Sequence, residues 1–147
     1  MSFYHALEGI ICAVSREAHL RFHIAIGILI SLFAYFYGIS SAEWAILILN
    51  IAAVISAEIF NTAVEQAVNT ATMEIKPSAK LAKDAAAGAV LVLAATSILV
   101  GFCLFGDFGR IGKTLTFIFT TPRVLIPCLV VGIGTVIFVI YGGKNAK

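Results

Sequence analysis

Residues 43–69 read EWAILILNIAAVISAEIFNTAVEQAVN, an apolar run whose second half carries acidic and amide side chains. At about 1.5 Å per residue, a helix of this length crosses a hydrocarbon core about 30 Å thick. The polar residues that follow Glu58 lie 3, 4, 7 and 11 positions further on, at Asn61, Thr62, Glu65 and Asn69. Those offsets place them on one face of a helix. The stretch therefore predicts a membrane-spanning helix with a polar stripe along its second half.

The composition of the whole chain agrees with a membrane protein. Of its 147 residues, 61% are hydrophobic and only 12% are charged, whereas soluble domains carry about 25% charged residues. The net charge of +2 is small, and the basic residues lie between apolar runs rather than in a patch. That distribution excludes nucleic acid as a partner.

The hydropathy pattern predicts further helices on either side of residues 43–69. Three more apolar runs, at residues 22–39, 82–105 and 124–141, each approach the length of a membrane span. Residues 3–18 have the spacing of an amphipathic surface helix, and residues 106–122 are expected to form an external loop or short interfacial stretch. We predict an all-α membrane bundle: a surface helix, three core spans and a fourth, C-terminal span. Residues 1–105 would form the membrane domain, and residues 106–147 the external loop and additional span.

Charge distribution predicts the orientation in the membrane. Four spans put both termini on the same side, and seven of the ten Lys and Arg residues then share that side. Because cytoplasmic loops carry an excess of Lys and Arg, we expect both termini to be cytoplasmic. The polar half of residues 43–69 would then lie at the cytoplasmic face of a multi-pass protein of the cell membrane.

The acidic residues of the polar stripe point to a metal ion. A carboxylate near the bilayer centre costs about 2.5–3.5 kcal/mol, so Glu58 and Glu65 call for a partner or a cavity. Glu17 adds a carboxylate on the same side of the membrane. Oxygen ligands suit Mg²⁺, and no His or Cys grouping indicates zinc. Asn61 and Thr62 have an alternative role, because such residues also hydrogen-bond neighbouring helices in lipid.

The segment after the stripe carries positive charge and a helix breaker. Lys76, Lys80 and Lys83 lie beside Glu74 and Asp84, with a proline among them. Lysines can neutralise a polyphosphate, although they also serve to set orientation. Asp84 could equally cap the N-terminus of the third span. The chain has neither a GxxxxGK[ST] loop nor a kinase-type GxGxxG, so an ATP site here would belong to neither common soluble class.

Two sequence blocks resemble one family. AEIFNTAVE at residues 57–65, followed by AKLAKDAAAGAVL at residues 79–91, is similar to the prokaryotic diacylglycerol kinase and undecaprenol kinase family. EAHLR at residues 17–21 resembles the same family near its surface helix. The resemblance covers roughly residues 3–105 and leaves out the fourth span.

The resemblance implies a lipid kinase that works as a homotrimer with active sites between protomers. Each family protomer has three spans and uses ATP with Mg²⁺. By matching positions, Glu58 would be the general base and Asn61 a positioning residue of the catalytic site. Glu17 and Glu65 would be the metal ligands.

The resemblance also implies a nucleotide site. Glu74, Lys83 and Asp84 would contact the nucleotide. Asn69 would lie near the nucleotide, at a position where the family usually has Asp. The amide can still form hydrogen bonds there, but it lacks the negative charge of the aspartate.

The sequence leaves several functions open. The leading hypothesis is transfer of the γ-phosphate of ATP to the hydroxyl of a membrane lipid, and the residues accommodate either undecaprenol or diacylglycerol. The blocks NTA at 61–63 and AAAG at 85–88 look more like the undecaprenol kinase branch, which favours undecaprenol. A small proton or cation transporter component is the competitor from another class, because intramembrane acids also carry ions. An inactive homologue is the third hypothesis.

Overall fold

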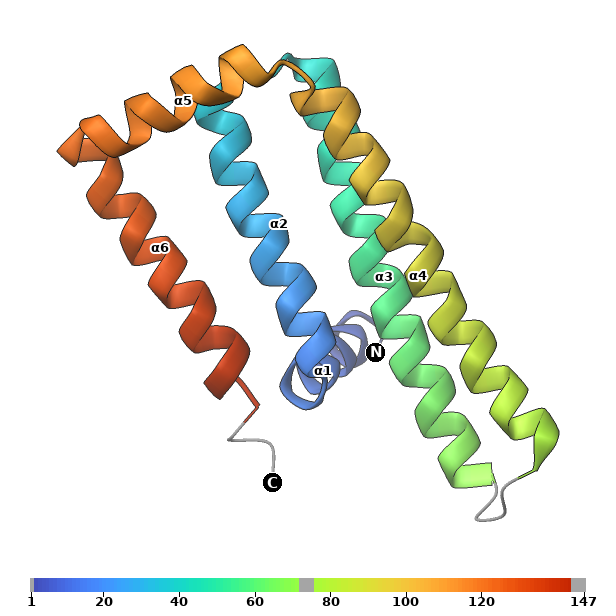
Figure 1. The fold of residues 1–147 in the computed structure, drawn as a ribbon. Coiled ribbons are helices and arrows are strands. Elements are labelled where there is room, and N and C mark those ends of the chain that lie inside the picture. The colour runs from blue at the N-terminus through green and yellow to red at the C-terminus, as the bar shows by residue number, and fades with distance from the viewer. Residues whose placement is uncertain (1, 72–75, 144–147) are drawn as a thin grey trace.

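The computed structural model describes residues 2–71 and 76–143, and six helices account for nearly all of them (Figure 1). In chain order these helices are α1 Ser2–Arg16, α2 Ala18–Tyr37, α3 Ser41–Ala71, α4 Pro77–Phe105, α5 Phe108–Thr120 and α6 Pro122–Tyr141. Four of them, α2, α3, α4 and α6, are long and apolar enough to cross a membrane. The predicted all-α bundle with four spans is therefore confirmed.

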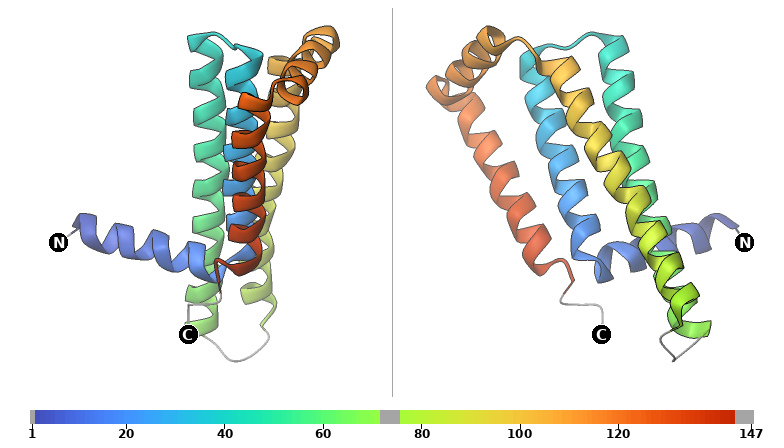
Figure 2. Two further views of the ribbon diagram at one scale, coloured as in Figure 1. Left: turned by 90° about the vertical axis from the view of Figure 1, so that its left-hand side faces the viewer. Right: turned by 45° about the vertical axis from the view of Figure 1, so that its right-hand side comes forward.

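The four long helices lie side by side in the order α6, α2, α3, α4 (Figure 1). The surface helix α1 crosses one end of this array, and α5 crosses the other end, joining α4 to α6 (Figure 2). The C-terminal end of α6 lies at the same end of the array as α1, as an even number of spans requires. The predicted polar half of α3 also lies toward this end.

Local sequence signals set the turn between α2 and α3. Gly38 adopts a positive φ of 75°, and its N–H donates to the oxygen of Ala34 over 2.9 Å. Glycine is the usual residue at such a left-handed helix end because it has no Cβ. Ser40 and Glu43 then form a reciprocal cap, with Ser40 N donating to Glu43 Oε2 over 2.6 Å and Glu43 N to Ser40 Oγ over 3.3 Å. Two helices can thus reverse direction within a few residues.

The segment between the third and fourth spans, for which we predicted an external loop or a short interfacial stretch, is mostly helical. Residues Phe108–Thr120 form the helix α5, and Asp107 caps it by accepting from Arg110 N over 2.9 Å. The glycines at 106, 109 and 112 favoured a loop interpretation. However, apolar and polar residues alternate here at helical spacing, and packing against α2 outweighs the modest cost of glycine in a helix.

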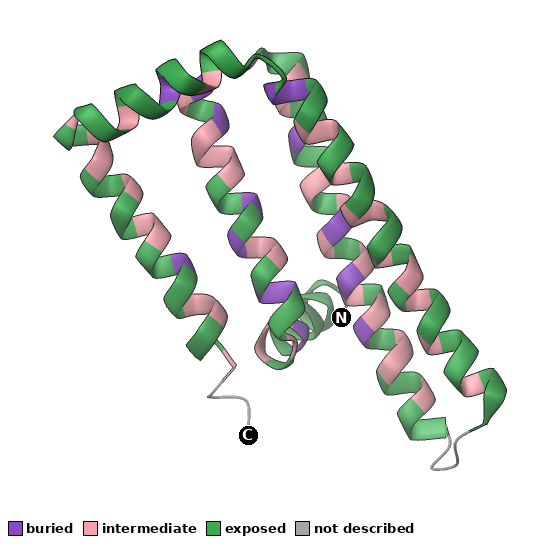
Figure 3. Ribbon diagram, in the orientation of Figure 1, coloured by how far each residue is buried: buried purple, intermediate pink, exposed green. Residues whose placement is uncertain are grey.

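The array is thin, and its buried residues form a narrow band between neighbouring helices (Figure 3). At the α5 end, the rings of Tyr37 and Phe105 lie 5.1 Å apart, edge to face. Arg110 of α5 stacks 4.3 Å over Tyr37 and donates from Nη2 to the oxygen of Gly38 over 2.7 Å. Large apolar side chains such as Phe60 face outward. One protomer therefore leaves much apolar surface to be covered by lipid or by other protomers.

Candidate active site

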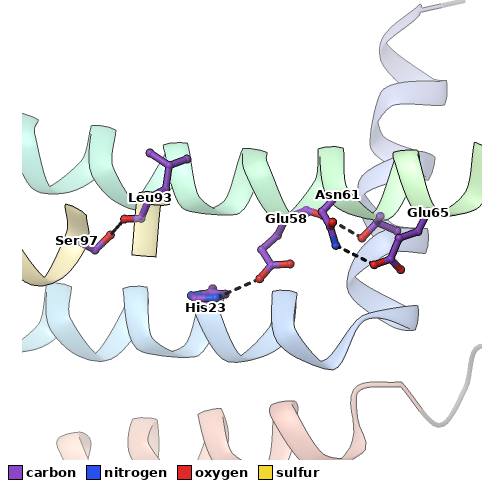
Figure 4. Close-up of polar contacts among 7 residues, drawn as sticks. His23, Glu58, Asn61, Glu65, Leu93 and Ser97 are labelled. Carbon is purple, nitrogen blue, oxygen red and sulfur yellow. Dashed lines mark hydrogen bonds and ion pairs between the residues drawn. The ribbon is translucent and has the colours of Figure 1, made fainter. Parts of the chain in front are cut away.

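The polar stripe of α3 begins at a buried carboxylate. Glu58 is only 5% exposed, and its Oε1 lies 3.1 Å from Nε2 of His23 on α2 (Figure 4). Thr62, one turn further along, is also buried and donates from Oγ1 to the backbone oxygen of Glu58 over 3.0 Å. The carboxylate thus lies between α2 and α3. The family resemblance assigned Glu58 the role of general base without naming a partner for it.

The next turn of the stripe holds an amide and a second carboxylate. Asn61 donates from Nδ2 to Oε1 of Glu65 over 3.1 Å (Figure 4). The other amide atom, Oδ1 of Asn61, is buried and has no hydrogen-bond partner among residues 2–71 and 76–143. Because an unpaired buried oxygen is costly, this atom is suited to a ligand. Carboxylate and amide oxygens are the donors that Mg²⁺ prefers, so these residues fit the predicted ion.

Glu17, the other predicted metal ligand, lies at the junction of α1 and α2. It is half-buried at the N-cap position of α2, and its side chain does not cap that helix. Among residues 2–71 and 76–143 of one chain, no group of three or more His, Cys, Asp or Glu side chains is placed to hold a metal.

Two of the residues predicted to contact the nucleotide, Asn69 and Lys83, meet where α3 and α4 run together. Lys83 donates from Nζ to Oδ1 of Asn69 over 2.6 Å. Asp84 follows on the exposed surface of α4, and Glu74 lies outside the described residues. The alternative role of Asp84 as a helix cap is wrong, because α4 begins at Pro77, two turns earlier. Proline is favoured at a first helical position, which starts α4 before its apolar part.

A buried arginine holds the same end of the array together. Arg21 of α2 is only 6% exposed. Its guanidinium donates to backbone oxygens in three places: Val14 and Ser15 near the end of α1, and Val139 in α6. From the sequence, Arg21 appeared only within the EAHLR block at residues 17–21 that resembles the family. These hydrogen bonds join the surface helix α1 to the spans α2 and α6.

An apolar cavity of about 400 Å³ opens between α2, α3 and α4. Its lining is apolar along nearly its whole length, with His23 at one end and Phe105 at the other. Asn50 and Ser97 are the polar exceptions among the other lining residues. The histidine that contacts Glu58 is therefore also a wall of a cavity suited to hydrocarbon.

His23 is the site residue that sequence analysis missed. The chain has no His or Cys grouping with metal-ligand spacing, so the sequence did not single out this histidine. A usable signal did exist, since His23 lies directly inside the apolar run that begins at Phe22. A polar residue within a span calls for a partner, and Glu58 is that partner.

Fold and site together define a multi-pass membrane protein with a buried carboxylate that contacts a histidine of an apolar cavity. The model of the prokaryotic diacylglycerol kinase family matches residues 4–105, and the chain belongs to that family. The match ends where α4 ends, so α5 and α6 lie beyond it.

Curated relatives support the same class. The chain is 39% identical over 104 residues to the undecaprenol kinase of Bacillus subtilis, a match that covers 71% of this chain and 85% of the relative. It is 34% identical over 105 residues to a diacylglycerol kinase of Synechocystis, covering 71% of this chain and 60% of that protein. A diacylglycerol kinase of Helicobacter pylori is 29% identical over 91 residues, covering 62% and 71%. No solved structure matches the chain.

These relatives support the leading hypothesis, a lipid kinase of this family, over a proton or cation transporter component.

Proposed function

We propose that this protein is an ATP-dependent kinase that transfers the γ-phosphate of ATP to the hydroxyl of undecaprenol at the cytoplasmic face of the cell membrane. The observation that carries the proposal is the position of Glu58. Its carboxylate contacts His23, which in turn lines the apolar cavity. A lipid chain in that cavity would bring its terminal hydroxyl within reach of a buried base.

Phosphoryl transfer to a lipid hydroxyl does not require a covalent intermediate on the protein. Phosphoryl transfer depends on positioning and on stabilising the charge of the phosphates. As the lipid oxygen attacks the γ-phosphorus, Glu58 would accept the hydroxyl proton and ADP would leave. Asn61 would position the reacting groups through its unpaired Oδ1.

The residues assigned to the metal and the nucleotide complete the proposal. Glu17 and Glu65 would hold Mg²⁺, which supplies positive charge between the phosphates of ATP. Lys83 and Asp84, with Glu74 and Asn69 nearby in the chain, would contact the nucleotide. A homotrimer with sites shared between protomers is the assembly that the family resemblance implies.

Undecaprenol is preferred to diacylglycerol for two reasons. The undecaprenol kinase of B. subtilis shares 39% identity and matches over 85% of its own length. In addition, the cavity lies between helices of one thin array, and its larger apolar lining residues are interrupted by Gly27, Ala94 and Gly101. A single flexible isoprenoid chain fits such a space more readily than two acyl chains with a glycerol head.

Assays with both lipids test the proposal. The full-length protein is purified into mixed micelles, and undecaprenol and diacylglycerol are compared at matched surface concentration with ATP and Mg²⁺. We expect radiolabelled phosphate in the lipid and a higher kcat/KM for undecaprenol. A clear preference for diacylglycerol would overturn the choice of substrate and leave the kinase intact. Failure to phosphorylate either lipid would overturn the proposed function itself.

A further inference from the structure

The contact between His23 and Glu58 joins Nε2 of the ring to Oε1 of the carboxylate over 3.1 Å. An ionised carboxylate can only accept hydrogen bonds, so a hydrogen bond to ionised Glu58 requires the proton on Nε2 of His23. Both side chains are largely withdrawn from solvent, at 23% exposure for His23 and 7% for Glu58. Within residues 2–71 and 76–143, the second carboxylate oxygen, Oε2, has no hydrogen-bond partner. His23 therefore contacts Oε1 of Glu58, and Oε2 is left to accept a hydrogen bond from a ligand.

No other side chain in the described residues forms a hydrogen bond or an ion pair with this carboxylate. Thr62 is the nearest hydroxyl on α3, but it donates to the backbone oxygen of Glu58. Arg21, two residues before His23, directs its guanidinium to backbone oxygens of α1 and α6. Asn61 donates to Glu65 instead. The orientation of the Glu58 carboxylate therefore depends on His23.

The position of the histidine also connects this carboxylate to the lipid side of the site. His23 lies one residue after Phe22 and one turn before Ile26 and Gly27, and all four line the apolar cavity. The same ring therefore contacts the carboxylate and lines the end of the space that accepts hydrocarbon. A ligand whose chain occupies the cavity would have its polar end beside Glu58.

We propose that His23 is a positioning residue for phosphoryl transfer: it donates from Nε2 to Glu58 Oε1 and so leaves Oε2 oriented to accept the proton of the lipid hydroxyl. This inference rests on the proposed function, in which Glu58 is the base. A general base works only within hydrogen-bond reach of the proton it removes. Because a displacement of about 1 Å can cost about 100-fold in rate, losing the donor should act on the transfer step.

Three variants of the full-length protein separate positioning from packing. His23→Phe keeps a ring but removes the donor, whereas His23→Gln replaces the ring by an amide whose N–H can reach the same oxygen. His5→Phe is the matched control, because His5 also pairs with a glutamate, Glu8 at 3.7 Å, but both of those side chains are 66% exposed. Each variant is assayed in mixed micelles with undecaprenol, and its oligomer is checked by size-exclusion chromatography.

We expect His23→Phe to lower kcat by about 10- to 100-fold while KM for ATP changes less than about threefold. His23→Gln should recover most of the lost rate, and His5→Phe should match the wild type. If His23→Phe does not elute as the wild-type oligomer, His23→Met provides the donor-free variant. If His23 were only structural, His23→Gln would not recover the lost rate, and kcat and KM would not change by different factors.

The outcomes distinguish this inference from the proposed function. A wild-type enzyme that phosphorylates the lipid, together with a donor-free variant of unchanged kcat, overturns the role of His23 alone. The same holds if His23→Gln is as impaired as His23→Phe. A wild-type protein inactive on both lipids overturns the proposed function, and the positioning role with it.

Discussion

Arg21 Nε donates to the backbone oxygen of Val139 over 3.2 Å and so joins two helices that are 118 residues apart in the chain. Its Nη1 also donates to the oxygens of Val14 and Ser15 over 2.8 and 3.0 Å. Carbonyls at helix ends lack partners within their own helix, so one guanidinium satisfies the ends of two helices. Through this side chain, the family-matched part of the protein holds the additional span α6.

Replacing Arg21 by methionine should loosen this junction. The change keeps an apolar stem of similar length but leaves the carbonyls without their donor. Unsatisfied buried groups cost about 1–3 kcal/mol each. We expect a lower melting temperature and faster amide hydrogen exchange at the end of α6. Arg16→Met is the control, because Arg16 is exposed in the last turn of α1. Equal exchange in both variants would show that Arg21 does not anchor α6.

Replacing Glu58 by glutamine should stop the chemical step. The variant keeps the shape of the side chain but removes the base, and general-base catalysis contributes about 10²- to 10⁴-fold. We expect kcat to fall by that order, with ATP binding by equilibrium titration nearly unchanged. If ATP affinity fell as far as kcat, Glu58 would be a binding residue.

Mixing variants tests whether Glu17 and Glu65 act across protomers. Glu17→Gln and Glu65→Gln each remove a charge that would bind Mg²⁺ in the proposed site, and each variant by itself should be nearly inactive. If the two carboxylates of one site come from different subunits, coassembled variants contain some intact sites. Activity should then reappear after the subunits are unfolded and refolded together. Mixtures as inactive as the separate variants would place both ligands in one protomer or remove them from the site.

The pair Lys83 and Asn69 allows a test of the nucleotide side. Lys83→Met removes a positive charge that would contact phosphate, and hydrogen bonds to charged groups contribute about 1.5–3 kcal/mol. KM for ATP should therefore rise by about tenfold or more. Lys80→Met, an exposed lysine of the same helix, should have little effect. A similar KM for both variants would limit Lys83 to a structural contact with Asn69.

Asn69→Asp should be tolerated. The aspartate would accept from Lys83 at the position of the present 2.6 Å hydrogen bond. Because exposed ion pairs contribute only about 0–1 kcal/mol, stability should change by no more than that. Measured melting curves and KM for ATP close to the wild type would agree, whereas loss of activity would mean that a neutral amide is required.

Cysteine labelling tests the orientation. In a background without the native cysteines at 12, 103 and 128, Lys113→Cys in α5 should react with a membrane-impermeant maleimide on intact cells. Lys80→Cys in α4 should react only after permeabilisation. The reverse pattern would contradict a cytoplasmic active site.

Much of the fold could be predicted from sequence because each span is a local property. Apolar length predicted all four spans, and the helical offsets of Glu58 and Glu65 placed both carboxylates on one face. The helix α5 was missed because its glycines suggested a loop. Glycines indicate only the local flexibility of the backbone. The helix α5 is stabilised by contacts of Arg110 with Tyr37 and Gly38, which lie about 70 residues earlier in the chain.

The sequence by itself determined that this protein spans a membrane, carries a polar stripe on its second span and shares the blocks of a lipid kinase family. Those features depend on residues close together in the chain. Only the tertiary structure decided that His23 contacts Glu58, that Arg21 reaches Val139 and that an apolar cavity ends at the same histidine. Each depends on which helices pack side by side, and in an apolar chain many helix faces look alike until packing selects between them.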